Sequence, residues 1–262
     1  MLTLPAVVDV IEGLSNWRLW LRIGWMDTIR RYRRTTLGPF WTALSVALFI
    51  GTIGIMYSQV FHQPIKTYLP YLSSGFVVWA PLATYITESC GAFFGAEGML
   101  KQVKMPYSIF IAAAVVRNVI VFFHNLLVFI IVAILFGSPV TGYTLLVFPA
   151  LFLLVINSVW VGIVMAVICT RYRDMLQVVA SAIQIAFFVT PIFWDASQAG
   201  GMSKVFLDMN ILYHFVNILR APLLGAAPTW VDWTAVLICT VVGWSFALWL
   251  FNRYYNRIIF WM

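Results

Sequence analysis

Long runs of apolar residues follow one another along almost the whole of this 262-residue chain. A helix needs about 20 mostly apolar residues to cross the hydrocarbon core of a bilayer. The runs lack the alternating ten-residue pattern of an outer-membrane β-barrel. We therefore predict an all-α membrane protein with six transmembrane helices. The predicted spans are 38–61, 68–90, 107–136, 143–169, 175–194 and 232–252.

The composition supports the same class of protein. Hydrophobic residues make up 63% of the chain and charged residues 10%, whereas soluble domains have about 45–50% and about 25%. There is too little polar surface to cover a globule in water, and a disordered chain would need the opposite balance. The apolar excess also runs almost end to end, which argues against a soluble enzyme with a small membrane anchor.

The distribution of basic residues predicts an orientation. A net charge of +7 would suggest nucleic-acid binding in a soluble protein. In membrane proteins, basic residues instead concentrate in the cytoplasmic segments. Twelve of the sixteen lysines and arginines fall on one side of the predicted spans, three fall on the other, and Arg117 lies within a span. We therefore expect both termini in the cytoplasm and no nucleic-acid partner.

Three segments outside the spans have a composition of their own. Residues 9–31 combine an apolar stripe with arginines, which predicts an amphipathic helix in the cytoplasmic interface, with a soluble helix packed on the bundle as the alternative. The connection 93–107 has a short stretch between glycines and predicts a brief cytoplasmic helix. The connection 195–231 contains a strongly apolar stretch and predicts a re-entrant pair of short helices in the outer leaflet. The apolar stripe of the first segment is Val10, Leu14, Trp17, Leu21, Trp25 and Ile29.

Motifs for catalysis are missing from the chain. No lysine follows a glycine, so the phosphate-binding loop GxxxxGK[ST] cannot exist here. The HExxH and GxSxG motifs are also absent, and the three cysteines lack metal-ligand spacing. We therefore predict no catalytic residue, no metal and no cofactor in this chain. If the protein uses ATP, another subunit must hydrolyse it.

Glu88 and Arg117 are the charged residues within the predicted spans, apart from Asp232 at the first position of the sixth span. A charge at mid-bilayer costs about 2.5–3.5 kcal/mol on insertion scales, and a pair between neighbouring helices would lower that cost for both partners. A satisfied structural pair, or residues that reach the interface, is one interpretation, and a proton or substrate site is the other. His124 in the third span stands alone, and a lone histidine is more often hydrogen-bonded structure than a ligand.

Aromatic residues make up 17% of the chain. Many lie at span ends, where an interfacial belt is expected, but several rings in the first and fifth spans do not. They either pack against lipid or form a pore face, because aromatic rings offer apolar platforms to the C–H faces of sugars. Polar residues between them would complete the lining. The candidate channel-lining residues are Trp41, Ser45, Phe49, Thr52, Tyr57, Gln184, Phe187, Phe188, Thr190 and Trp194.

Three stretches resemble the ABC-2 type permeases that export polysaccharides. RYRRTTLGPFW (31–41) resembles the segment that leads into their first span. MLKQVKMPYSIF (99–110) resembles their cytoplasmic segment between spans two and three. RYRDMLQVV and FFVTPIFW (171–179 and 187–194) resemble the start of their fifth span and its Thr-Pro ending. At 101–104 the chain has Lys-Gln-Val-Lys in place of a more continuously basic pair, which leaves the subfamily open.

The resemblance implies partners and a division of the chain. Such a permease works in the bacterial inner membrane as a homodimer, with two ATP-binding cassette subunits that bind ATP and magnesium. It exports a lipid-linked polysaccharide such as O-antigen, capsule or teichoic acid. The chain would consist of an interfacial arm, 1–34, and a six-span domain, 35–262, with re-entrant helices in 197–228 at the outer mouth. The ATPase-coupling residues would be Glu97, Met99, Leu100, Lys101, Gln102, Val103, Lys104 and Met105.

A cluster of arginines is the candidate cytoplasmic gate. Guanidinium groups bind phosphate through bidentate hydrogen bonds, so the lipid-pyrophosphate end of the polymer is expected there. Topology-setting charge and binding of anionic membrane lipids are the alternative. The channel would lie between spans one and five of two copies. A drug or a non-sugar lipid is the alternative cargo, and an intramembrane enzyme is the alternative class. The arginine cluster consists of Arg30, Arg31, Arg33 and Arg34.

Overall fold

The structure is a computed structural model, and it describes residues 4–33, 35–38, 40–196 and 202–262. Within these ranges every regular element is a helix, which confirms the predicted all-α class. Four stretches of helix are long and apolar enough to cross a membrane, so the chain is a multi-pass membrane protein. They are Phe40–Val60, Ser108–Phe136, Gly142–Arg171 and Trp230–Trp261.

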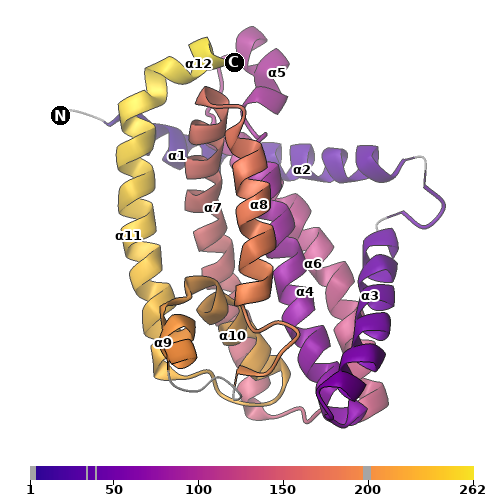
Figure 1. The fold of residues 1–262 in the computed structure, drawn as a ribbon. Coiled ribbons are helices and arrows are strands. Elements are labelled where there is room, and N and C mark those ends of the chain that lie inside the picture. Colours follow the sequence, from indigo (N-terminus) through magenta and orange to yellow (C-terminus); the bar gives the residue numbers. More distant parts are fainter. Residues whose placement is uncertain (1–3, 34, 39, 197–201) are drawn as a thin grey trace.

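The long helices run alongside one another and form a bundle (Figure 1). The helix α4 occupies the predicted second span and α8 the predicted fifth. However, α4 is less apolar than the four helices above, and α8 has only 15 residues. The count of six spans therefore stays a prediction. The bundle helices are α3 (Phe40–Val60), α4 (Ile65–Ser89), α6 (Ser108–Phe136), α7 (Val147–Arg171), α8 (Met175–Val189) and α11 (Trp230–Tyr254).

Short helices cover the two ends of the bundle (Figure 1). One end carries both termini together with α1, α2, α5 and α12, and we call it the arm end. The opposite end carries α9 and α10, which are the two short helices predicted in the connection 195–231. Whether they enter the membrane stays a prediction, and residues 197–201 lie outside the described ranges. The short elements are α1 (Pro5–Ser15), α2 (Trp17–Tyr32), η1 (Phe94–Ala96), α5 (Glu97–Gln102), η2 (Gly142–Leu146), α9 (Met202–Met209), α10 (Ile211–Leu223), η4 (Tyr255–Arg257) and α12 (Ile258–Trp261).

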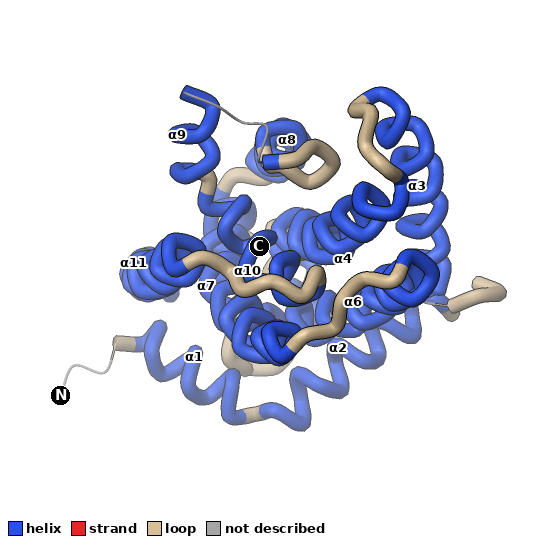
Figure 2. Tube along the Cα trace, turned by 90° about the horizontal axis from the view of Figure 1, so that it is seen from below, coloured by secondary structure: helices blue, strands red, loops and turns tan. Residues whose placement is uncertain are grey.

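The single helix predicted over 9–31 is wrong, because the arm consists of two helices, α1 and α2, that meet at an angle (Figure 2). The break lies at Asn16. The Nδ2 of Asn16 and the Oγ of Ser15 both donate to the carbonyl oxygen of Glu12, at 2.8 and 2.9 Å. Short polar side chains that bond to the nearby backbone compete with helix continuation, and the apolar stripe gave no sign of this.

The arm packs closely against α6 at two glycines, Gly13 and Gly24. A Cβ atom at Gly24 would lie 2.7 Å from the carbonyl oxygen of Ala113, and one at Gly13 would overlap Ser108. The Trp17 and Trp25 side chains of the apolar stripe remain exposed. The arm thus packs on the bundle through its glycine face and leaves apolar side chains beside arginines uncovered. Such a helix can also lie on a lipid surface.

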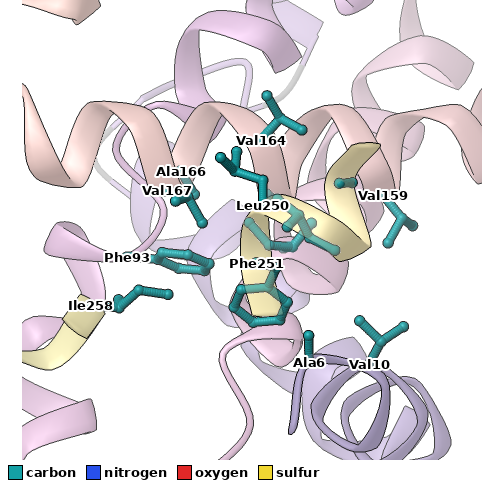
Figure 3. Close-up of a cluster of buried hydrophobic side chains, with 14 of the residues drawn as sticks. Ala6, Val10, Phe93, Val159, Val164, Ala166, Val167, Leu250, Phe251 and Ile258 are labelled. Atoms are coloured by element: carbon teal, nitrogen blue, oxygen red, sulfur yellow. The ribbon is translucent and has the colours of Figure 1, made fainter. Parts of the chain in front are cut away.

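A buried apolar cluster joins the elements at the arm end (Figure 3). Phe93, which lies between α4 and η1, is fully buried and stacks against Phe251 of α11 with ring centroids 6.4 Å apart. Ala6 and Val10 of α1 belong to the same cluster, as does Ile258 of α12. The arm, the chain's C-terminal end and the connection between α4 and α6 therefore share one core.

We expect Gly24→Ala to lower the thermal stability of the chain in detergent. The added methyl group meets backbone, which cannot move aside cheaply, and overpacking of this kind costs about 1–3 kcal/mol. The matched control is Gly51→Ala in α3, where a Cβ atom would meet nothing within 4 Å and helix propensity improves by about 0.5–1 kcal/mol. Equal melting temperatures for the two variants would contradict the close contact between α2 and α6.

Candidate functional site

The predicted coupling residues form a short helix that protrudes at the arm end. The α5 side chain of Leu100 is buried against Ala96 and Phe110, and the C-terminal residue Met262 packs on the same cluster. Lys101 Nζ forms an ion pair with Glu97 Oε1 at 2.5 Å, and the hydrogen bond from Lys101 lowers the pKa of Glu97. Leu100 thus anchors α5, and the other faces of this helix remain exposed. The exposed members are Met99, Lys101, Gln102, Val103 and Lys104, and Glu97 and Met105 are half-buried.

The arginine cluster lies at the end of α2, and its described members are not equivalent. Arg30 and Arg33 are exposed. Arg31 Nη1 forms an ion pair with Glu88 Oε1 of α4 at 2.5 Å. Arg34 lies outside the described residues. Two of the four predicted phosphate ligands are therefore open to a ligand, whereas a third is engaged by a carboxylate.

An ion network connects α2, α4 and α6. Arg117 Nη2 lies 3.0 Å from Glu88 Oε2, and its Nη1 lies 3.4 Å from Asp27 Oδ2. Asn118 also donates to Glu88, at 3.4 Å. A structural pair of Glu88 and Arg117 is one of the interpretations that the sequence left open, and the structure has the two side chains paired. The contribution of Asp27 and Arg31 to this network was not predicted. These two residues are four apart on one face of α2, and that spacing was the available signal.

A cavity of about 330 Å³ lies beside the arginine cluster, between α2, α6 and the loop that leads to α3. The Nδ1 of His124 donates to the carbonyl oxygen of Ile120 at 2.7 Å, so its Nε2 accepts a hydrogen bond while the ring is neutral. Nothing in the sequence indicates that His124 would lie near an arginine. The cavity is lined by Trp25, Thr28, Ile29, Tyr32, Arg33, Gly38, Ile120 and His124.

The predicted channel-lining residues of α3 share one exposed face. Trp41, Ser45, Phe49 and Thr52 are exposed along it, and Tyr57 is half-buried. Their spacing of three or four residues places the first four on one side of a helix. Tyr57 packs edge-on against Phe193, with ring centroids 5.8 Å apart.

The predicted residues of α8 and of the turn that follows it are more varied. Gln184 and Phe188 are exposed and Phe187 is half-buried. Thr190 is fully buried, and its hydroxyl accepts a hydrogen bond from Asn210 at 3.0 Å. The indole of Trp194 donates to the carbonyl oxygen of Phe188 at 3.2 Å. In this conformation Thr190 packs inside the chain, while Gln184 and Phe188 face outward.

Phe76 of α4 brings the two aromatic faces together. Helices α3 and α8 both lie against α4 (Figure 2). Phe49 stacks on Phe76 with ring centroids 4.4 Å apart, and Phe187 meets Phe76 edge-on at 6.1 Å. The sequence analysis missed Phe76, because it lies in an apolar run where nothing sets one ring apart from its neighbours. Aromatic side chains from three helices therefore form a continuous set.

A buried arginine fastens the opposite end of the bundle. Arg220 of α10 is 2% exposed, and its Nη1 donates to the Tyr71 hydroxyl at 2.8 Å and to the carbonyl oxygen of Pro191 at 2.6 Å. Its guanidinium also lies 4.3 Å from the ring centroid of Tyr71. Arg220 thus joins α10 to α4 and to the end of α8. From the sequence, Arg220 is only one of the basic residues in the charge count, and its buried contacts were not predicted.

A histidine–carboxylate pair joins the short helices at the same end of the bundle. His214 Nδ1 lies 2.7 Å from Asp232 Oδ1, and its Nε2 lies 2.9 Å from the carbonyl oxygen of Asp208. Both neighbours accept hydrogen bonds, so a protonated imidazole satisfies both. The hydrogen bond to Asp232 raises the pKa of His214. The pair joins α9, α10 and the start of α11.

Within the described ranges, no set of three or more His, Cys, Asp or Glu side chains is placed to hold a metal ion. Cys90 and Cys169 are buried free thiols, and Cys239 is half-buried. What the chain offers is an open arginine pair, a polar cavity, an aromatic face and a protruding helix.

Comparison with known proteins places these features in a family context. The sequence profile described as ABC-2 type transporter matches residues 18–224. The O-antigen export system permease protein RfbA of Myxococcus xanthus is 24% identical over 219 residues, which cover 82% of this chain and 84% of that protein. The protein of the same name from Klebsiella pneumoniae is 22% identical over 211 residues, which cover 72% of this chain and 80% of that protein.

We expect the His214–Asp232 pair to make thermal stability depend on pH. The folded pKa of His214 is raised, so the pair's contribution is complete below the unfolded pKa of about 6.5 and is lost as pH rises through the folded pKa. Melting temperatures between pH 5.5 and 9 should fall more steeply for the wild type than for His214→Gln. The difference in the free energy of unfolding is about 1.4 kcal/mol for each tenfold difference in the proton affinity of His214 between the folded and unfolded states. Parallel curves would show that the pair is not ionised.

Proposed function

The chain belongs to the ABC-2 type transporter family, and we propose that it is the membrane subunit of an ATP-driven exporter of lipid-linked polysaccharide. Two copies would form a channel, and two ATP-binding cassette subunits would drive it. The family implies an ATP-binding partner, and both relatives are named as O-antigen export permeases. The structural observation that carries the proposal is α5, a helix anchored by Leu100 that presents its remaining faces outside the bundle.

The arm end faces the cytoplasm of the bacterial inner membrane in this proposal. The basic segments of the sequence meet at that end, since Arg173 contacts the carbonyl oxygen of Met262 and Arg171 lies 5.2 Å from the ring centroid of Trp261. Basic residues favour the cytoplasmic side. Six crossings, with α4 and α8 included, bring both termini to one side, as the structure has them (Figure 1).

The arginine cluster and the neighbouring cavity would receive the lipid-pyrophosphate end of the polymer. Arg30 and Arg33 are exposed, and Arg33 and His124 line the same cavity. Guanidinium groups give a phosphate bidentate, charge-assisted hydrogen bonds. The uncovered apolar stripe of α2 lies beside these groups and suits the adjoining lipid chain and membrane lipids.

The sugar chain would pass between the α3 and α8 faces of a homodimer. The exposed Phe49 and Phe188 offer platforms for sugar rings, and Ser45, Thr52 and Gln184 supply hydrogen-bonding groups between them. The helices α9 and α10 would form the re-entrant outer mouth. A drug or non-sugar lipid as cargo would need the same ATPase contact but not this aromatic face, whereas an intramembrane enzyme would need neither.

We expect Val103→Asp to reduce recovery of the ATP-binding subunit with the tagged permease by about tenfold, because a buried interface anchor contributes more than about 1 kcal/mol. Val103 is 54% exposed on the protruding segment. The control is Val140→Asp, which is 87% exposed between α6 and η2, away from α5. Equal recovery from both variants would contradict the coupling surface, and no ATP-binding subunit with the wild type would favour the enzyme alternative.

We expect Phe49→Ala and Phe188→Ala each to slow polymer export about two- to tenfold, since an aromatic contact contributes about 0.5–1.5 kcal/mol. Polymer at the outer surface would be quantified per copy of permease. Phe152→Ala is the control, because Phe152 is 65% exposed on α7, which carries none of the candidate channel-lining residues. Unchanged polymer export in both phenylalanine variants would contradict a sugar channel lined by these rings.

A further inference from the structure

We propose that the N-terminal arm transmits movement of α5 to the arginine cluster, with Asp9 and Glu88 as the positioning residues. This inference rests on the proposed function, because it takes the ATP-binding subunit as the source of the movement. We define the coupling segment as residues 90–107, which lie between α4 and α6 and contain α5. The arm is tied to the chain immediately before this segment, within it and immediately after it.

Asp9 ties α1 to the chain just after the coupling segment. Its side chain is buried, and its Oδ2 and Oδ1 accept the backbone N–H groups of Tyr107 and Ser108 at 2.8 and 3.0 Å. The Ser108 hydroxyl donates back to the Asp9 carbonyl oxygen at 2.7 Å. The first N–H groups of a helix have no partner within it, and a carboxylate there is favoured by the helix dipole. A side chain of α1 therefore caps α6.

Glu88 ties α2 to the chain just before the coupling segment. Its two carboxylate oxygens are divided between Arg31 of α2, at 2.5 Å, and Arg117 of α6, at 3.0 Å. Arg117 in turn contacts Asp27 of α2 at 3.4 Å. The side chains of Glu88 and Arg117 are mostly buried, with 18% and 14% exposed. Charges in such a place lose more when separated than charges in water do.

Apolar contacts tie the arm to the interior of the coupling segment. Phe93 is buried in the same cluster as Ala6 and Val10 of α1 (Figure 3). Leu100 of α5 is buried in a cluster against which Ile23 of α2 packs. Polar ties at both ends and apolar contacts between them thus connect the whole segment with the two arm helices.

A shift of the coupling segment must therefore move the arm or break these contacts. The close contacts at Gly13 and Gly24 leave the arm little room to slide on α6. Arg31 belongs both to the network and to the arginine cluster, and Arg33 lies two residues further along. Movement of α5 would in this way change the separation of the guanidinium groups and the shape of the adjoining cavity.

The experiment uses the complex of the full chain with its ATP-binding subunit in lipid nanodiscs, without polymer. An environment-sensitive fluorophore on Leu21→Cys of α2, a position that is 38% exposed, reports the response of the arm to a non-hydrolysable ATP analogue. We expect Asp9→Asn and Glu88→Gln to reduce this response at least about fivefold, the lower end of typical coupling between sites. ATP hydrolysis should stay close to the wild-type rate. A residue that merely supports the fold would lower both together.

Asp232→Asn is the matched control, because Asp232 is also a buried carboxylate that accepts a backbone N–H at a helix start, but at the opposite end of the bundle. In this variant the arm should respond to the ATP analogue as it does in the wild type. If Asp9→Asn and Glu88→Gln do not fold, Arg31→Gln replaces them, because its side chain is exposed. This variant should also reduce the response of the arm. An unchanged response in Arg31→Gln and in the folded variants would overturn the inference, as would equal losses in Asp232→Asn. Failure of the wild type to bind an ATP-binding subunit would instead overturn the proposed function.

Discussion

The ion pair between Glu88 and Arg117 decides how this bundle is assembled at the arm end. A guanidinium group in an apolar helix has few neighbours that can satisfy it, because water is excluded from the surroundings of the helix. Pairing with Glu88 fixes α4 against α6. The remaining donors and acceptors of the pair then recruit Asp27 and Arg31, so the position of α2 follows from the same requirement.

The two ends of the bundle use different polar groups for the same purpose. At the arm end, carboxylates of Asp9 and Glu88 hold helix starts and guanidinium groups. At the opposite end, Arg220 holds the backbone after α8, and Asp232 holds the start of α11 and His214. Between these ends the contacts are mainly apolar. Apolar contacts lack direction, so the polar contacts at the two ends specify which helices lie together there.

Much of the fold follows from apolar run length and little of the candidate site does. The runs identify the long helices, and Gly95 and Pro106 flank the segment that contains α5, because both signals are local. The break at Asn16 is also local, but the apolar stripe continues across it and hides it. In the sequence Arg220 counts only as a charge and Arg31 only as a member of the arginine cluster, because their partners Pro191 and Glu88 are distant in the chain. Phe76 lies in an apolar run of the sequence, where nothing separates it from the other apolar residues.

Arg31 belongs both to the ion network around Glu88 and to the arginine cluster. This has a thermodynamic consequence for the proposed exporter. A pyrophosphate that takes Arg31 as a ligand competes with Glu88 for the same guanidinium group. Binding of substrate therefore weakens the tie between α2 and the end of α4, and a strong tie weakens the binding of substrate by the same factor, because coupling between two sites is reciprocal. Arg30 and Arg33 carry no such linkage, since neither contacts the Glu88 carboxylate. In the proposed exporter, substrate affinity and arm movement would thus be connected through Arg31, whereas Arg30 and Arg33 would contribute affinity alone.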